Sequence, residues 1–147
     1  MSKSQDRQSA GGAEHATCLC YHAQRAARSL GRRFDEAFRP IGLTNGQYSL
    51  LAALSQCAPV SVGELATALG MDRTTMTAAL KPLVRRRLVK VTVDPADRRN
   101  RLVAMTKLGA AALAKARPLW RATHWEVEKL LNAGGPDRLR HDLRALF

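Results

Sequence analysis

The stretch from residue 61 to residue 106 constrains the fold most, because it carries two helix signals separated by one glycine. Ser61 and Glu64 have the S-x-x-E spacing of a capping box, which satisfies the first free amides of a helix. Gly70 can end that helix in a left-handed conformation, and Asp72 is a suitable N-cap for a second helix. Apolar residues follow the helical period in both segments: Val62, Leu65, Ala66 and Leu69, then Met76, Leu80, Leu83, Val84 and Leu88. This pattern predicts a helix-turn-helix that presents its second helix outward.

Two short β-prone runs follow, KVTV at 90–93 and RLVAM at 101–105. They bracket DPADRRN, whose Pro, Asp and Asn residues favour a turn. We therefore expect a two-stranded hairpin with a basic tip, which is the wing of a winged helix-turn-helix.

Positive charge is concentrated in the same part of the chain. From Met71 to Arg101 nine Lys and Arg stand against three Asp, a net +6 and half of the chain's net charge of +12. A pI near 10.8 points to an anionic partner, either nucleic acid or a membrane surface. A helix start rich in Thr and Arg, beside a basic loop, suits contact with phosphates and a groove. We predict that the partner is double-stranded DNA; the alternative is a solvated charged face on a metabolic protein.

Four motifs in this stretch follow one another: SVGELATALGMDRTTMT, LVRRRLV, DPADRR and D-x-R-x5-[L/M]-T. The last pattern is filled by Asp97, Arg99, Met105 and Thr106. As a set they resemble the MarR family of bacterial transcription regulators, from about Cys18 to the C-terminus. The resemblance implies a mainly α (α+β) fold, a winged helix-turn-helix whose long N- and C-terminal helices form a dimerisation region.

The recognition helix departs from the family pattern at two positions. Ala78 stands where many members carry an arginine. Pro82 lies inside the helix, where it cannot donate to the Ala78 carbonyl and should bend the helix.

The chain divides into a polar tail and one domain. We expect residues 1–16 to be a flexible tail and residues 17–147 to be a single MarR-type winged-helix domain. Its DNA-binding core would span about 45–106, and its dimerisation helices about 17–40 and 107–147.

Apolar periodicity predicts the helices outside the DNA-binding core. A long first helix from Thr17 to Arg39 carries a near-heptad stripe: Leu19, Ala23, Ala26, Leu30, Phe34, Ala37 and Ile41. A helix from Gln47 to Cys57 should turn four residues inward: Tyr48, Leu51, Ala52 and Leu54. Thr106 is a good N-cap for a second long helix, which Pro118 should kink.

A final helix opens at Pro136 and carries an apolar C-terminal face: Leu139, Leu143, Leu146 and Phe147. Such a face makes little sense on a monomer. A helix-turn-helix that reads a two-fold operator also needs a dimer to space its recognition helices. We therefore expect a homodimer on a palindromic operator, most often acting as a repressor.

The candidate DNA contacts lie at the start of the second helix and on the wing. We expect base-edge and phosphate contacts from the recognition helix and a minor-groove contact from Arg98. Asp97 would hold Arg99 or a neighbouring arginine in place. The full set of candidates is Ser61, Arg73, Thr74, Thr75, Thr77, Lys81, Asp97, Arg98, Arg99 and Arg101.

A second group of residues suggests an effector pocket. Trp120 and His124 have i, i+4 spacing and share one face of the long helix. Four residues of the first two helices could complete the pocket: Tyr21, Gln24, Arg28 and Tyr48. The surplus of arginine favours a small anionic effector, such as an aromatic acid or its acyl-CoA thioester. The alternative is that these aromatic side chains belong to the dimer core.

The cysteines allow two further readings. Cys18, Cys20 and His22 form a C-x-C-x-H string, but residues two apart point about 200° apart on a helix, so we expect no metal site. Cys20 has the position of the peroxide-reactive cysteine in organic-hydroperoxide-sensing MarR members, which makes a redox-sensing regulator one alternative. Those members carry tyrosines where this chain has Gln24 and Phe34, and a buried thiol without a donor reacts slowly.

Several functional classes are not supported by the sequence. Nothing resembles a phosphate loop, a catalytic triad or an acid–base pair of carboxylates, so we expect neither an enzyme nor a cofactor. No apolar run approaches 18 residues and no signal peptide is present, so we expect a cytoplasmic protein without membrane contact. A non-specific architectural DNA binder remains the other alternative, since charge alone would suffice for it.

Overall fold

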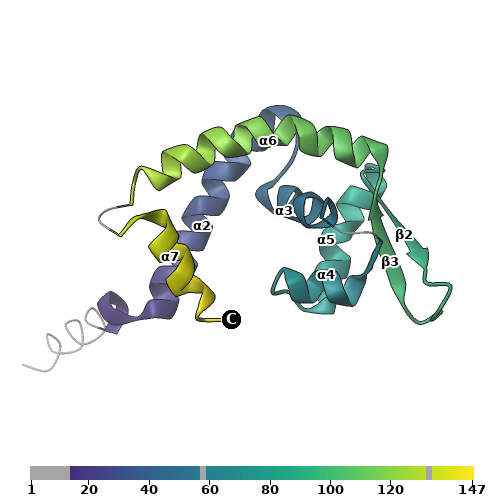
Figure 1. Ribbon diagram of the computed structural model, residues 1–147, viewed down its shortest axis with the longest axis horizontal. Helices are drawn as coiled ribbons and strands as arrows, with labels where there is room; N and C mark the ends of the chain where they lie inside the picture. The colour runs from purple at the N-terminus through teal and green to yellow at the C-terminus, as the bar shows by residue number, and fades with distance from the viewer. Residues whose placement is uncertain (1–13, 57–58, 132–133) are drawn as a thin grey trace, which may run out of the picture.

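Two long helices organise the molecule, α2 (Leu19–Phe38) and α6 (Lys107–Glu128). Figure 1 shows α6 along the whole upper edge, α2 descending from it, the winged unit at one end and α7 at the other. The computed structural model describes residues 14–56, 59–131 and 134–147. Residues 14–17 are helical and precede Cys18, whereas residues 1–13 of the expected tail lie outside the described residues.

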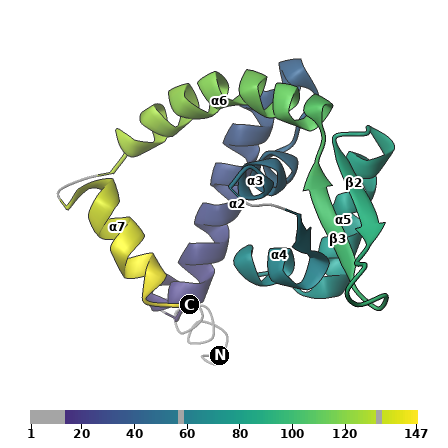
Figure 2. The same cartoon turned by 45° about the vertical axis from the view of Figure 1, so that its right-hand side comes forward.

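The remaining elements are short and build the winged unit and the C-terminus. They are η1 (Arg39–Ile41), α3 (Asn45–Leu54), β1 (Val60–Ser61), α4 (Val62–Ala68), α5 (Arg73–Arg85), β2 (Val89–Val93), β3 (Arg101–Met105) and α7 (Gly135–Arg144). The helix-turn-helix is α4 and α5, and the wing is β2 and β3, so both predictions are confirmed. In Figure 2, α3 is seen nearly end-on, surrounded by α2, α6, α4 and α5.

The local signals that begin and end α4 and α5 act as predicted. The Glu64 backbone N–H donates to Ser61 Oγ at 3.1 Å, and the Ser61 N–H donates to the Glu64 carboxylate at 2.8 Å. Gly70 has φ +63° after α4, and Asp72 accepts from the Thr75 N–H at 2.8 Å to cap α5. A second capping box, between Thr44 and Gln47 at the start of α3, was not predicted.

The sheet has three antiparallel strands in the order β1-β3-β2. Val103 of β3 lies between Val60 of β1 and Val91 of β2. Val103 is fully buried, so the sheet joins the core through its central strand.

The core lies beneath the crossing of α2 and α6. Its most deeply buried side chains are Phe38, Leu50, Leu51, Met76, Leu83 and Val103. The predicted stripe on the first helix omitted Phe38, which is fully buried, whereas Ala37 and Ile41 of the stripe are half-buried. Leu19 and Leu30 are 76% and 38% exposed, since only the last turns of α2 pack against the rest of the chain.

The first turn of α6 is joined tightly to the turn between α5 and β2. Thr106 caps α6, and its hydroxyl donates to the Arg87 carbonyl at 2.7 Å while its N–H donates to the Leu88 carbonyl at 3.0 Å. Gly109 lies so close to Leu88 that an added Cβ would be 2.1 Å from the Leu88 oxygen. The first turn of α6 is therefore fixed against the turn that follows the recognition helix.

The C-terminal helix α7 has no buried residue in this single chain. Its apolar face is open: Leu139 is 43%, Leu143 43%, Leu146 67% and Phe147 95% exposed. None of the helices in the described residues is both long and apolar enough to cross a membrane.

Candidate nucleic-acid interface and effector site

The outward face of α5 forms a shallow hollow of about 370 Å³ lined by five exposed residues: Arg73, Thr74, Thr77, Ala78 and Lys81. Thr74, Ala78 and Lys81 lie on the opposite side of the helix from the buried Met76, Leu80 and Leu83. Arg73 and Thr77 lie at the edge of this face and also line a second hollow together with Leu80. The structure thus brings four of the predicted contacts onto one accessible surface, as a recognition helix in a groove requires.

The hydroxyl protons of two predicted contacts are already used inside the helix. Thr75 Oγ1 donates to the Asp72 carboxylate at 2.6 Å, and Thr77 Oγ1 donates to the Arg73 carbonyl at 2.8 Å. Both oxygens keep lone pairs, so in this rotamer they can accept hydrogen bonds from a base but cannot donate. Hydrogen bonds from Thr75 also hold the pKa of Asp72 below its ordinary value, which keeps the cap ionised.

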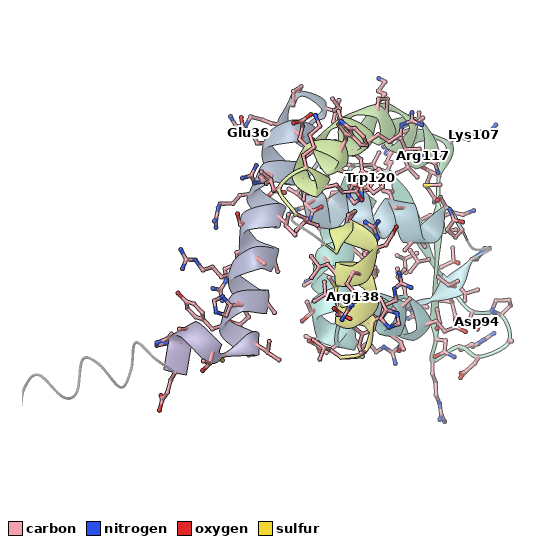
Figure 3. The ribbon with its side chains drawn as sticks, turned by 60° about the vertical axis from the view of Figure 1, so that its left-hand side comes forward. Glu36, Asp94, Lys107, Arg117, Trp120 and Arg138 are labelled. Atoms are coloured by element: carbon pink, nitrogen blue, oxygen red, sulfur yellow. The ribbon has the colours of Figure 1, made fainter. Side chains whose placement is uncertain are left out.

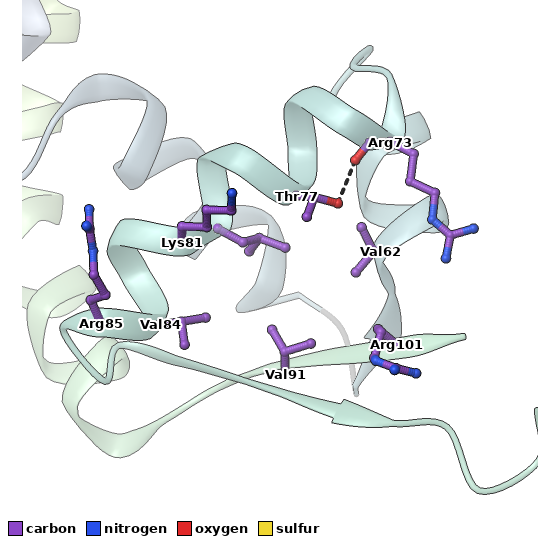
Figure 4. A pocket seen from close by; sticks show the side chains of 9 residues that line it. Val62, Arg73, Thr77, Lys81, Val84, Arg85, Val91 and Arg101 are labelled. Carbon is purple, nitrogen blue, oxygen red and sulfur yellow. Dashed lines mark hydrogen bonds between the residues drawn. The ribbon is translucent and has the colours of Figure 1, made fainter. Parts of the chain in front are cut away.

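A cleft of about 430 Å³ separates α5 from the wing (Figure 4). Its apolar lining consists of Val62, Leu80, Val84 and Val91. Four cationic side chains lie around it: Arg73, Lys81, Arg85 and Arg101. Three of these cations were predicted from the sequence; Arg85 was not, although it follows Lys81 at i+4. This arrangement suits a phosphate backbone that passes between helix and wing.

Backbone contacts organise the wing tip, and Asp97 contacts the predicted Arg99 there through its main chain and not through its side chain. The Asp97 carboxylate accepts from the Arg99 backbone N–H at 3.0 Å and from the Asn100 amide at 3.3 Å, and does not hold an arginine guanidinium. Arg101 Nη1 instead donates to the Arg98 carbonyl at 3.0 Å and braces the tip. Among the described residues no hydrogen bond or ion pair engages the Arg98 guanidinium, which leaves it available to DNA.

Ser61 differs from the other candidates because it has a structural role in the fold. It is half-buried, pairs with Leu102 of β3 and caps α4. The hydrogen bonds from Ser61 lower the pKa of Glu64, so this capping box stays charged. Any DNA contact at this position would come from the first turn of α4.

A column of stacked rings runs from the core to α6. The ring centroids of Phe38 and Tyr48 are 4.9 Å apart, those of Tyr48 and Trp120 6.3 Å, and those of Trp120 and His124 4.6 Å. Figure 3 shows Trp120 and Arg117 on neighbouring turns of α6 above α3. Three of the six predicted effector residues are therefore brought together: Tyr48, Trp120 and His124.

Two arginines that the sequence analysis missed complete this site. Burial raises the pKa of Tyr48, and the nearby charges of Arg117 and Arg121 act in the opposite direction. No described residue hydrogen-bonds the Tyr48 hydroxyl. Arg117 lies three residues before Trp120 and Arg121 three residues before His124, so the helical period could have indicated both.

His124 connects this column to α7. Its Nε2 lies 2.9 Å from the Glu128 carboxylate, which also accepts from Arg140 of α7 at 2.7 Å. The hydrogen bond from Arg140, with smaller effects of His124, lowers the pKa of Glu128. Glu128 thereby joins the end of α6 to the helix that follows it.

The other predicted effector residues make their side-chain contacts within α2 and with His15 just before it. Arg25 donates to the Tyr21 hydroxyl at 3.0 Å, and Arg28 donates to Gln24 Oε1 at 2.9 Å. All three predicted residues, Tyr21, Gln24 and Arg28, are exposed and none contacts the stacked rings. Within a single chain the structure does not bring them to the site.

The cysteines are placed differently from the prediction. Cys18 caps α2 by accepting from the Tyr21 N–H at 3.4 Å, and the described residues contain no group of three possible metal ligands. Cys20 is exposed and not buried, and Gln24 Nε2 donates to its sulfur at 3.3 Å. The expectation of a thiol without a donor was therefore wrong, because Gln24 takes the place of the tyrosine.

Comparison with known proteins points to one family. The family model described as MarR family matches residues 41–100. The transcriptional activatory protein BadR of Rhodopseudomonas palustris is 36% identical over 118 residues, which are 78% of this chain and 67% of that protein. The HTH-type transcriptional repressor NicR of Pseudomonas putida is 37% identical over 105 residues, 71% of this chain and 66% of that protein.

Similar proteins with solved structures are also transcription regulators. The M. tuberculosis transcriptional regulator MosR in complex with DNA has a TM-score of 0.80 and 43% identity, covering 88% of this chain and 92% of that one. Bordetella bronchiseptica BpsR, described through the regulation of its DNA binding by 6-hydroxynicotinic acid, has a TM-score of 0.79 and 25% identity, covering 89% and 94%. The chain belongs to the MarR family, and it is a DNA-binding transcription regulator with the winged helix-turn-helix fold.

Proposed function

We propose that this regulator binds a palindromic operator as a homodimeric repressor and that a small anionic aromatic acid, free or as its acyl-CoA thioester, releases it. The observation that carries the effector half of the proposal is the column of Tyr48, Trp120 and His124 beside Arg117 and Arg121. Flat apolar faces next to guanidinium groups fit an aromatic ring that bears a carboxylate.

The chemistry of the site supports this class of ligand. An aromatic ring that enters between Tyr48 and Trp120, whose ring centroids are 6.3 Å apart, can stack against both, and an arginine guanidinium binds a carboxylate in a bidentate manner. The free hydroxyl of Tyr48 offers a donor or acceptor to a substituent on the ring. BpsR, whose DNA binding responds to a hydroxylated aromatic acid, shares this fold.

The position of the site supports a switch. The rings join α3, which lies against the helix-turn-helix, to α6, whose first turn is hydrogen-bonded to the end of the recognition helix. A ligand that enters between α3 and α6 would shift α6 and thereby the separation of the two recognition helices in a dimer. Release requires that the ligand bind the shifted arrangement more tightly than the DNA-bound one.

The exposed apolar faces support the dimer. The first half of α2 and the whole of α7 leave large side chains uncovered at the same end of the molecule (Figure 1). A second copy of the chain can cover both, and it would place two recognition helices on one duplex.

The two tryptophans provide a matched test of the effector site. Trp120 stacks between Tyr48 and His124, whereas Trp125 is 61% exposed and lies near Lys129. With 6-hydroxynicotinate and benzoate as probes, the fluorescence response should persist in Trp125→Phe and disappear in Trp120→Phe. A response that depends on Trp125 alone would contradict the proposed site.

A second candidate function rests on the hydrogen bond from Gln24 to Cys20. An exposed thiol with a donor can form a thiolate, which an organic hydroperoxide oxidises to a sulfenic acid while the peroxide is reduced to the alcohol. In that case peroxide should release the wild-type protein from DNA but leave Cys20→Ser bound, whereas Cys18→Ser should respond as the wild type does.

A further inference from the structure

Ala78 occupies the position on α5 that faces furthest from the core. It lies two residues from Met76 and two from Leu80, and two residues correspond to about 200° of rotation around a helix. Met76 is fully buried and Leu80 is 3% exposed, so Ala78, which is exposed, points almost directly outward. In a recognition helix this is the direction of the base edges.

The shortness of Ala78 shapes the surface around it. Thr74 and Lys81 lie four residues before and three residues after it, on the same face, and they line the 370 Å³ hollow with Ala78, Arg73 and Thr77. A longer side chain at position 78 would project into this hollow. With alanine there, the helix backbone can approach a base pair closely.

The chemistry of Ala78 restricts what it can recognise. A methyl group neither donates nor accepts, and the only methyl group that a base exposes in the major groove is the C5-methyl of thymine. The hydrogen-bond donors and acceptors of the base edges lose water without compensation when a methyl is pressed against them. Thr77 does not supply a donor beside Ala78, because its proton goes to the Arg73 carbonyl.

We infer that Ala78 is a specificity residue that reads the 5-methyl group of one thymine in each operator half-site. This inference rests on the proposed function, since it presupposes sequence-specific binding by a dimer. Burial of one methyl group contributes about 0.8 kcal/mol, which corresponds to about fourfold in affinity for each half-site. Loss of the methyl in both half-sites should therefore weaken binding roughly fifteenfold.

The test begins with a duplex selected from random DNA by the wild-type protein. Each thymine of the selected half-sites is then replaced in turn by deoxyuridine, which removes the methyl group and leaves every hydrogen-bonding group unchanged. We expect one symmetry-related pair of thymines at which this replacement weakens binding about fifteenfold. If no position changes the affinity by more than about twofold, Ala78 does not read thymine.

Two variants then assign the contact. Ala78→Gly removes only the methyl and should bind the thymine duplex roughly fifteenfold more weakly, with no further loss on deoxyuridine replacement at that pair. Thr74→Ser is the matched control: it removes the methyl of a threonine that lines the same hollow, keeps the hydroxyl, and should remain sensitive to the replacement. The opposite result, with sensitivity lost in Thr74→Ser and retained in Ala78→Gly, would assign the methyl contact to Thr74 and overturn the inference.

The folded state and the proposed function are tested separately. Circular dichroism shows whether Ala78→Gly keeps its helix, because glycine inside a helix is destabilising relative to alanine. The deoxyuridine series uses only the wild-type protein, so its result does not depend on whether Ala78→Gly folds. Failure to enrich any sequence would contradict sequence-specific regulation itself, whereas an enriched palindrome with no deoxyuridine effect would contradict only the role of Ala78.

Discussion

Replacement of Gly109 by alanine should destabilise the protein although alanine is the better helix former. The added Cβ would lie 2.1 Å from the Leu88 carbonyl oxygen and 2.8 Å from Met105 Cγ, and neither distance is tolerated by real atoms. The first contact is with backbone, which cannot rotate away as a side chain does. The first turn of α6 must therefore move off the turn that follows α5.

The size of the effect follows from what that movement disrupts. Thr106 donates to the Arg87 and Leu88 carbonyls at 2.7 and 3.0 Å, and hydrogen bonds of this kind contribute about 0.5–1.5 kcal/mol each. Overpacking adds about 1–3 kcal/mol, and the higher helix propensity of alanine returns about 1 kcal/mol. A net loss of about 3 kcal/mol should lower the Tm by roughly 6–12 °C in a chain of this size.

Urea unfolding followed by circular dichroism measures the loss, with Gly63→Ala as the matched control. Gly63 is also in the first turn of a helix, but its Cβ would meet only Ser61 Oγ at 3.9 Å, an ordinary contact. Gly63→Ala should be as stable as the wild type or slightly more stable. If Gly109→Ala were equally stable, the close approach of α6 to the α5–β2 turn would be refuted.

Four further predictions concern single features of the molecule. Arg98→Ala should weaken operator binding by about 1–3 kcal/mol without loss of fold or dimer, and a change below about twofold in a binding titration would rule out a minor-groove contact. Deletion of residues 136–147 should abolish the dimer, and sedimentation of an intact dimer at micromolar concentration would disprove this. Arg87→Gly should raise the free energy of unfolding by about 1 kcal/mol, because Arg87 has φ +57°, where a side chain is strained; an unchanged urea midpoint would argue against that strain. The pKa of Glu128 is lowered, chiefly by Arg140, so the ionised Glu128 stabilises the fold above its ordinary pKa near 4.5. This stabilisation is lost as the pH falls through the lower pKa of the folded state. Glu128→Gln should therefore unfold with a smaller dependence on acid pH, and identical acid unfolding curves for variant and wild type would contradict this.

The elements that the sequence predicted best are those specified by neighbouring residues. The capping box of α4, the Gly70 turn and the wing all depend on contacts between residues a few positions apart, which spacing reveals. Strand β1 was missed because a strand of two residues is too short to show an alternation of apolar and polar side chains. It is recognised only by its pairing with β3, some forty residues later.

The parts that sequence reasoning misplaced depend on how helices cross. Phe38 is buried because the last turn of α2 meets α3, which periodicity along α2 alone cannot show. Tyr48 stacks on Trp120 because α3 packs under α6. The sequence indicated a shared site from the residue types, but it could not show that these two rings stack on each other. The contacts of Gln24 were misjudged in the same way, since its amide turns to Cys20 and Arg28 within α2.

The central claim is that one molecule couples an effector site on α6 to DNA reading by α5, and reciprocal titration tests it most directly. An aromatic acid that changes the fluorescence of Trp120 is titrated into the protein with and without the selected operator. Linkage requires that the operator weaken ligand binding by the same factor by which the ligand weakens operator binding, and we predict a factor of about 5–150. Equal ligand affinities in the two titrations would contradict a ligand-driven switch.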